Sequence, residues 1–434
     1  MESLAGPPLR VPRSLAGHTA LMSDDDHASI WSPLRHRTFA TLWGSWVIAN
    51  LCIWMADVAA AWLMTSLTDS KFMVAMIQTA TTLPVFLLVL PAGVLADRVN
   101  RGNAFLFAQL WATTVLALIA FLVWADSINP VLLLVLVFAS SLATAIRWPA
   151  MAALLPEVLP RGQMLQGISL NGVGANASRL AGPLLAGAIL AAWGGMAVFA
   201  LCALLSLMAA VLMARSGYRR PPAQAPSLPW LQSLAAGVQH VRASVRLQAI
   251  LRRAFLFFSI ATALMGLLPS VARDLQGGPQ VYSFLFACMG AGAVSVGLVM
   301  PLVRRRLGFQ GMSTASMLVM GLCALVISLA PSPWLVAPAM LLVGMAWMTA
   351  SNTLSTSAQM VLPDGLRARG MALMYMAGMA GSAIGAAFFG ALADAIGLRP
   401  GLQVLAAFGV LVGWALRHRL PIADAEPNDN ANPG

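Results

Sequence analysis

The sequence predicts an all-α membrane protein with twelve transmembrane helices in two six-helix halves related by pseudo-symmetry. Three observations carry this prediction: a composition of 59% hydrophobic and 9% charged residues, twelve long apolar segments, and a glycine pattern that recurs in both halves. Soluble globular chains carry roughly 25% charged residues. A chain of 434 residues with so few charges cannot cover a water-facing surface, which excludes an ordinary soluble enzyme.

The predicted helices are apolar runs of about 20 residues, the length needed to cross the hydrocarbon core of a bilayer. The first six form a predicted N-terminal bundle over 39–214, and the last six form a C-terminal bundle over 254–416. The twelve runs are 39–66, 73–96, 104–125, 130–153, 167–192, 195–214, 254–272, 281–303, 312–330, 333–357, 370–393 and 398–416.

Both ends of the chain are predicted to be polar cytoplasmic tails. Residues 1–38 contain Arg10 and Arg13 with no apolar core after them, followed by three aspartates at 24–26. This pattern indicates a disordered tail rather than a cleaved signal peptide. Residues 417–434 form a second tail of disordered composition.

The basic residues predict the orientation in the membrane. Arg147 and Arg179 fall inside segments, and Lys71, Arg273 and Arg399 lie between segments on one side. The remaining 21 of the 26 basic residues lie on the side of both termini. Because cytoplasmic loops carry the excess of Lys and Arg, we expect this side to be the cytoplasm and the protein to be a multi-pass inner-membrane (plasma-membrane) protein. The positive charge is thereby explained without nucleic acid.

The longest connection between segments, residues 215–253, joins the two predicted bundles. It begins with the proline-rich stretch GYRRPPAQAPSLP, and residues 231–253 then place apolar positions at helical spacing with arginines between them. This pattern predicts an amphipathic helix at the inner leaflet, where its arginines would meet anionic lipid headgroups.

The two halves repeat each other in sequence. LPEVL (155–159) follows the fourth segment, and LPDGL (362–366) follows the tenth. Three glycines of the fifth segment recur 203 residues later in the eleventh: Gly182, Gly187 and Gly194 correspond to Gly385, Gly390 and Gly397. A parallel six-plus-six repeat is typical of secondary transporters, whose site lies at the midplane between the halves.

The loop after the second segment reads GVLADRVNRGN and contains Gly93, Asp97, Arg98 and Arg101. It resembles the loop motif of the major facilitator superfamily, although Asn100 replaces the usual glycine. The resemblance implies a conformational latch, in which Asp97 accepts hydrogen bonds at the N-terminus of a helix of the other half. A solvated cytoplasmic loop is the alternative, and it would explain only the two arginines.

The fifth segment contains NASRLAGPLLAG, residues 176–187. Gly182, Pro183 and Gly187 resemble the motif that superfamily antiporters carry there, with Ala186 in place of a second glycine. The resemblance implies a packed hinge typical of exporters. A purely structural helix kink remains the alternative, because proline removes a backbone donor.

Four further stretches resemble the superfamily branch that contains enterobactin exporters and macrolide efflux proteins. They are PAMAALLPEVLPRGQM (149–164), AAGVQHVRASVRLQAILRRAFLFF in the connector and the start of the seventh segment, LLPSVARD (267–274) and LPDGLRARGMAL (362–373).

Asp57 is the one acidic residue well inside a predicted segment. A carboxylate within a membrane is costly, so it is paired, protonated or in contact with water. We therefore predict that Asp57 couples transport to protons, and a structural ion pair or packing hydrogen bond is the alternative. The branch usually has glycine-aspartate where this chain has Cys52-Ile53, one helical turn before Asp57 on the same face.

Two cations, Arg147 and Arg179, lie at depth in the fourth and fifth segments. Each either pairs with a substrate or Asp57, or extends along the helix toward the cytoplasmic headgroups. The other predicted substrate-binding candidates are polar or aromatic residues within segments: Asn176, Trp54, Asn352 and Gln359.

The sequence contains no phosphate-binding loop, serine elbow or HExxH motif, and its Cys and His residues lack metal-ligand spacing. It therefore predicts no enzyme, no cofactor and no metal site. We expect a monomeric proton-coupled exporter of small amphipathic molecules, siderophore-like or drug-like, that works by alternating access. Uptake or uniport by the same fold, and a membrane receptor or lipid-handling module without transport, are the alternatives.

Overall fold

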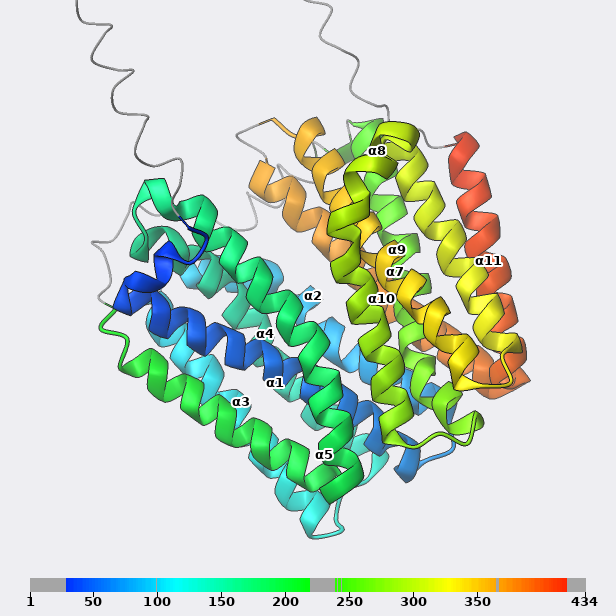
Figure 1. Cartoon of the computed structure of the whole chain (residues 1–434), viewed down its shortest axis with the longest axis horizontal. Helices are drawn as coiled ribbons and strands as arrows, with labels where there is room; N and C mark the ends of the chain where they lie inside the picture. Colours follow the sequence, from blue (N-terminus) through cyan, green and yellow to red (C-terminus); the bar gives the residue numbers. More distant parts are fainter. Residues whose placement is uncertain are drawn as a thin grey trace, which may run out of the picture.

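Every regular element of the computed structural model is a helix within the residues it describes, which are 29–98, 100–218, 239, 241–242, 244–363 and 367–419 (Figure 1). Within these ranges, the side chains of 89–98, 152–153, 161, 298–305, 367–369 and 418–419 lie outside the description. The long helices are α1 (Arg37–Leu67), α2 (Lys71–Arg98), α3 (Arg101–Trp124), α4 (Pro130–Val158), α5 (Met164–Ala214), α7 (Val245–Asp274), α8 (Pro279–Leu329), α9 (Pro333–Val361), α10 (Arg367–Ile396) and α11 (Leu398–Arg419).

Two of these helices are 51 residues long, and each is divided by a glycine. Gly194 in α5 has φ +77°, and Gly308 in α8 has φ +60°, which is the left-handed region that glycine enters without steric cost. Each helix therefore supplies two membrane-spanning lengths, and the predicted total of twelve spans in an all-helical protein is confirmed in the described part of the chain.

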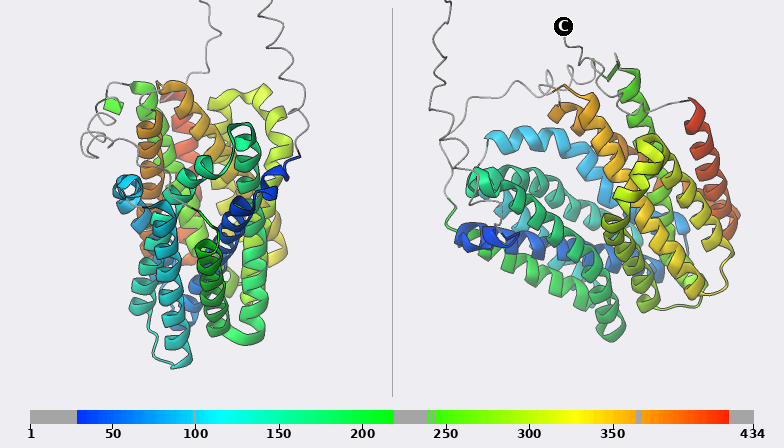
Figure 2. Two further views of the ribbon diagram at one scale, coloured as in Figure 1. Left: turned by 90° about the vertical axis from the view of Figure 1, so that its left-hand side faces the viewer. Right: turned by 45° about the horizontal axis from the view of Figure 1, so that its top comes forward.

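The helices form two bundles that lean against each other (Figures 1 and 2). Helices α1–α5 form the N-terminal half and α7–α11 form the C-terminal half. Across the boundary, α5 packs on α8, and α2 packs on α10 and α7. The face at which α1 begins and α11 ends is called here the terminal face, and it runs from the left side to the top of Figure 1. The face that carries the α1–α2 and α7–α8 links is called the opposite face.

Two glycines allow the halves to touch near the opposite face. A Cβ atom on Gly187 of α5 would overlap the side chain of Ser283 in α8. A Cβ atom on Gly390 of α10 would lie 2.6 Å from Cβ of Ala75 in α2. Small residues let helices approach closely within a membrane, so these repeat-related positions perform the same packing role on the two sides of the boundary.

Polar contacts close the same face at its edge. The carboxylate of Asp394 in α10 accepts hydrogen bonds from Ser70 Oγ and from the backbone N–H of Lys71, both at 2.5 Å, and so caps the start of α2. Arg273 of α7 donates to the carbonyl oxygen of Thr65 and pairs with Asp69 at 3.2 Å. Each contact joins one half to the other.

The connector differs from the prediction where it meets α7. Helix α7 begins at Val245, with Ser244 as its N-cap, so residues 245–253 continue into the membrane span. Arg253 is fully buried and donates to the carbonyl oxygen of Leu416 at 2.7 Å. The expectation that this arginine meets lipid headgroups was wrong, because it satisfies a carbonyl near the end of α11 instead.

The predicted tails, 1–38 and 417–434, extend too far inward, because Ser32–Arg35 form a 3-10 helix, α1 already begins at Arg37 and α11 continues to Arg419. Residues 1–28, 219–238 and 420–434 lie outside the described residues.

We expect Gly187→Ala and Gly390→Ala to weaken closure of the opposite face, because each new methyl group meets a side chain of the other half. The measurement is the labelling rate of a cysteine introduced at Ser70 in a background without the four native cysteines. The rate should rise several-fold for both variants. Gly172→Ala is the matched control on α5, since no atom lies within 4 Å of its Cβ position. Equal rates in all four proteins would contradict the proposed role of these glycines.

Candidate functional site

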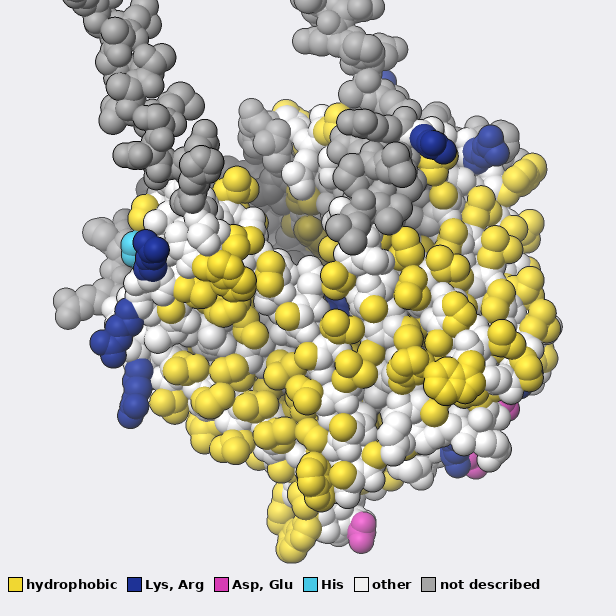
Figure 3. Space-filling view, viewed as in Figure 1, with side chains coloured by type: hydrophobic (Ala, Val, Ile, Leu, Met, Phe, Trp, Pro, Cys, Tyr) yellow, Lys and Arg dark blue, Asp and Glu magenta, His cyan; other side chains and the backbone are white. Residues whose placement is uncertain are grey.

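A cavity of about 640 Å³ lies between the two halves. This volume is typical of small-molecule sites. Helices α1 to α5 line it from one side, and α7 to α10 line it from the other. Because the opposite face is closed, the cavity opens toward the terminal face, where Figure 3 shows the surface hollowed between the halves.

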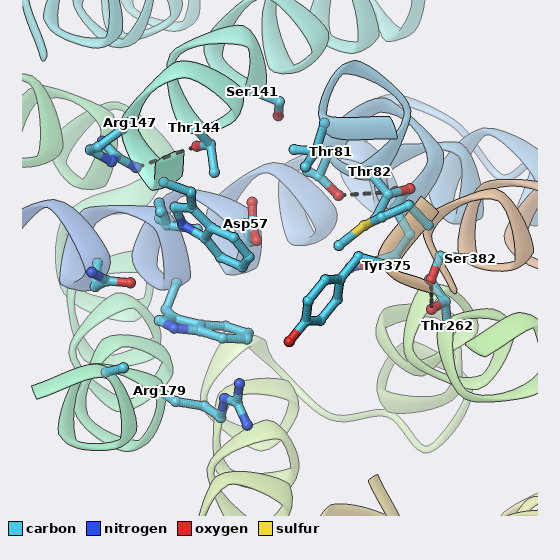
Figure 4. Close-up of a pocket in the computed structure, with 18 of the residues that line it drawn as sticks. Asp57, Thr81, Thr82, Ser141, Thr144, Arg147, Arg179, Thr262, Tyr375 and Ser382 are labelled. Carbon is cyan, nitrogen blue, oxygen red and sulfur yellow. Dashed lines mark hydrogen bonds between the residues drawn. The ribbon is translucent and has the colours of Figure 1, made fainter. Parts of the chain in front are cut away.

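One face of α1 brings Asp57 to the cavity. Trp46, Asn50, Ile53 and Asp57 all line it, at steps of four, three and four residues that keep side chains on one side of a helix. Among the described residues, the Asp57 carboxylate has no hydrogen-bond donor and no ion-pair partner. The carboxylate therefore borders the cavity without a fixed partner (Figure 4).

Arg179 reaches the cavity from α5, on the face that also carries Asn171 and Ala175. Its guanidinium carbon lies 5.1 Å from the ring centroid of Trp54, a cation–π contact. Gly182 makes this arrangement possible, since a Cβ there would lie 2.6 Å from Trp54 Cβ. The Nε and Nη1 atoms of Arg179 are buried with no hydrogen-bond partner among the described residues. Buried donors are normally satisfied, so this guanidinium is suited to bind an anionic or acceptor group.

Arg147 differs from Arg179 although it also borders the cavity. Its side chain is 2% exposed, and its Nη1 donates to Oε1 of Gln109 at 2.6 Å. Its Nη2 lies 3.3 Å from the hydroxyl of Thr144. Arg147 is thus held by neighbouring side chains of α3 and α4, although its Nε is buried without a partner among the described residues, and no ion pair joins it to Asp57 there.

Three sequence-predicted candidates are absent from the cavity lining among the described residues: Asn176, Asn352 and Gln359. Asn176 follows the lining residue Ala175 by one position, a rotation of about 100° around the helix, and its Nδ2 donates to the carbonyl of Gly172 at 2.9 Å. Asn352 is rotated from Ser351 in the same way. Gln359 is exposed near the end of α9 at the terminal face.

An aromatic wall in the C-terminal half was not predicted from the sequence. Phe258 of α7, Trp347 of α9 and Tyr375 of α10 all line the cavity. Phe258 and Trp347 pack edge to face with their centroids 5.1 Å apart. In the sequence these residues cannot be told from ordinary apolar positions. They line the cavity because of how their helices face the other half, which the sequence does not show.

The predicted latch and hinge are only partly described. Gly93, Asp97 and Arg98 belong to the end of α2, and their side chains lie outside the described residues. Arg101 pairs with Glu157 of α4, which also accepts from the hydroxyl of Tyr218.

Asn100 caps α3 through its side-chain oxygen, 2.9 Å from the N–H of Gly102. This is a local reason for asparagine in place of the usual glycine. Helix α5 continues through Gly182 and Pro183, and its one non-helical residue is Gly194.

Comparisons with known proteins agree with this architecture. Residues 28–433 match the sequence profile of a family described as transmembrane secretion effector. Macrolide efflux protein A of Streptococcus pyogenes is 23% identical over 303 residues, which are 68% of this chain and 73% of that protein. The staphyloferrin A transporter of Staphylococcus aureus (strain NCTC 8325 / PS 47) is 19% identical over 278 residues, 63% of this chain and 69% of that protein.

Solved structures with the same fold are transporters. The nucleoside transporter NupG superposes with a TM-score of 0.72 at 13% identity, covering 87% of this chain and 98% of its own. A bacterial homologue of the human lysosomal transporter Spinster, in an inward-facing and unoccupied conformation, gives a TM-score of 0.72 at 13% identity and covers 88% and 96%. At this identity the likeness shows the fold alone.

We expect Gln109→Leu to destabilise the protein by about 1–3 kcal/mol, because it removes the acceptor of a buried charged donor at Arg147. The measurement is the apparent Tm of the purified protein in detergent. Gln109→Glu is the matched control, since a carboxylate keeps a charge-assisted bond to Arg147 and should leave the Tm near that of the wild type. An unchanged Tm in the leucine variant would show that Arg147 is held by other contacts.

Proposed function

Because this chain belongs to the transmembrane secretion effector family of the major facilitator superfamily, we propose that it is a proton-coupled exporter of small amphipathic molecules. It is a membrane transporter and not an enzyme. The proposed mechanism is alternating access, in which the two halves rock about the cavity between them.

The observation that carries the proposal is a cavity between two halves that is closed at one face and open at the other. The contacts that close it are hydrogen bonds, one ion pair and glycine packing, all of which can separate without breaking either bundle. The open face carries both ends of the described chain. We infer from the excess of arginine that this face is cytoplasmic. The cavity would then receive molecules from the cytoplasm, as an exporter requires.

One relative favours export over uptake, because it is a macrolide efflux protein, and another is a staphyloferrin A transporter. We propose a drug-like or siderophore-like molecule as the substrate of this chain. The cavity suits such molecules because apolar and aromatic side chains dominate its wall and charged groups are few. We propose an anionic or neutral amphipath as substrate, since Arg179 offers unpaired donors there.

Asp57 is the proposed proton carrier. Its carboxylate borders the cavity, and no hydrogen bond or ion pair holds it among the described residues, which supports this role. A carboxylate at membrane depth with access to a cavity is suited to exchange protons with water.

Asp97 is the proposed latch of the conformation open to the other side, and Gly182, Pro183 and Gly187 form the proposed hinge. Asp394 offers support by analogy, because it already caps α2 from the other half at the closed face. Reversal of this arrangement would place Asp97 near a helix start at the terminal face. We also propose that anionic lipids bind the protein around the terminal face and that the protein is a monomer.

The test of the function is flux in proteoliposomes loaded with an amphipathic dye. An exporter should move the dye against its gradient when a pH gradient is imposed, and collapse of that gradient should stop accumulation. Flux without pH dependence would indicate a uniporter. Binding without any flux would indicate a receptor or lipid-handling module.

We expect Asp57→Asn to abolish pH-driven accumulation while leaving folding and membrane insertion intact. An amide keeps the shape and hydrogen-bonding capacity of the carboxyl group but carries no titratable proton. The measurement is dye flux with and without the pH gradient, and gradient-free counterflow serves as the control for an intact binding site. Accumulation with unchanged pH dependence would assign Asp57 a structural role.

We expect Arg179→Gln to weaken transport of an anionic substrate about tenfold or more, and transport of a cationic one little. The reason is that a buried guanidinium pairs strongly with an anion. Arg147→Gln is the comparison variant, since Gln109 already occupies that guanidinium and no substrate selectivity should follow. The measurement is the flux of one anionic and one cationic dye through each variant, compared with the wild type. Equal losses for both dyes in Arg179→Gln would rule out direct pairing.

A further inference from the structure

The charges of the cavity wall belong to one half of the protein. Among the described lining residues, Asp57, Arg147 and Arg179 come from α1, α4 and α5, all in the N-terminal half. The lining residues of α7, α8, α9 and α10 are apolar, aromatic or hydroxyl-bearing. A molecule in the cavity therefore meets charge on one side and uncharged surface on the other.

The uncharged side has an ordered aromatic wall. Phe258 and Trp347 lie edge to face at 83°, and the buried Phe257 packs against both from behind, with centroids 5.5 and 6.5 Å away. Gly378 of α10 leaves the space that Phe258 fills, since a Cβ there would lie 2.9 Å from the ring. Close packing fixes the orientation of these rings before any ligand arrives.

Tyr375 stands in front of this wall. It lies on α10, three residues before Gly378, and is 51% exposed although it is within the protein's central cavity. Figure 4 shows its ring projecting into the cavity toward the side that carries Asp57 and Arg179. Its hydroxyl has no hydrogen-bond partner among the described residues.

Two neighbouring hydroxyls of the same half already bond to each other. Thr262 of α7 donates to Ser382 of α10 at 2.9 Å, so this pair joins the two helices of the wall. Tyr375 therefore offers both an open ring face and an unused hydroxyl. Tyrosine with one apolar and one polar part is a frequent contact residue in binding sites.

We propose that Tyr375 determines specificity and that the substrate binds in one orientation. The planar apolar part lies on Tyr375 and the Phe258–Trp347 wall of the C-terminal half, and the anionic or acceptor end lies at Arg179 of the N-terminal half. This inference rests on the proposed role of the cavity as the substrate site. It adds that both halves must hold the same molecule at once, each through a different chemical group.

The experiment measures dissociation constants of three probes for the purified full chain by equilibrium dialysis. 2-Naphthalenesulfonate carries a planar ring and an anion, 2-naphthylmethanol carries the ring alone, and cyclohexylmethanesulfonate carries the anion without an aromatic ring. The variants are Tyr375→Ala, Tyr375→Phe and Arg179→Gln. Phe388→Ala is the matched control, because Phe388 is an exposed aromatic residue of the same helix outside the cavity lining.

We expect Tyr375→Ala to weaken binding of both naphthyl probes about tenfold and of the cyclohexyl probe less than about twofold. Tyr375→Phe keeps the ring and should stay within about threefold of the wild type for the naphthyl probes. Arg179→Gln should weaken both sulfonates and spare the neutral alcohol. In the double variant the two losses for 2-naphthalenesulfonate should multiply, because its two ends bind separate walls.

Equal losses of affinity for all three probes in Tyr375→Ala would overturn the inference. Tyr375 would then shape the cavity without contacting the aromatic ring of the probe specifically. No loss for any probe, or no binding of any probe to the wild type, would overturn it as well. The proposed transport function fails separately: binding with the expected pattern but no flux in proteoliposomes rejects transport and leaves the orientation standing.

Discussion

The two halves meet where glycine replaces a side chain, at Gly187 against Ser283 and at Gly390 against Ala75. Water and lipid supply no hydrophobic force between helices inside a membrane, so association depends on close packing and on satisfied polar groups. These contacts lie toward one face, and the helices diverge from there toward the other. The position and the open side of the cavity follow from that single geometric fact.

The sequence predicted the architecture well because its signals are strong. Twelve apolar runs, a one-sided arginine distribution and a glycine repeat leave few alternatives in a bilayer. The repeat also predicted equivalent roles: Gly182 packs on Trp54 of α1, and Gly385 packs on Ser259 of α7. Gly194 and Gly397 both have positive φ. The two glycines of each matched pair thus have the same structural role, each in its own half.

The site was predictable only in part, for reasons of geometry. Asp57, Trp54, Arg147 and Arg179, which the sequence marked as candidates, line the cavity. A charge within a membrane span is costly unless it is paired or in contact with water, and this makes charged residues stand out in the sequence. Asn176 differs from Ala175 by one position and so turns away from the cavity. Tyr375 carries no charge and gives no such signal. Its place depends on how two halves meet, which no local pattern encodes.

The carboxylate of Asp394 holds Ser70 Oγ and the first N–H of α2 at the same moment. Separation of the halves at this face would release one carboxylate and two donors, and would part Arg273 from the carbonyl of Thr65. These groups lie at the ends of four different helices and are already partly exposed, so water can replace each partner as it leaves. Under the proposed alternating access, opening at this face would therefore exchange hydrogen bonds between the halves for hydrogen bonds to water, at a small net cost in free energy.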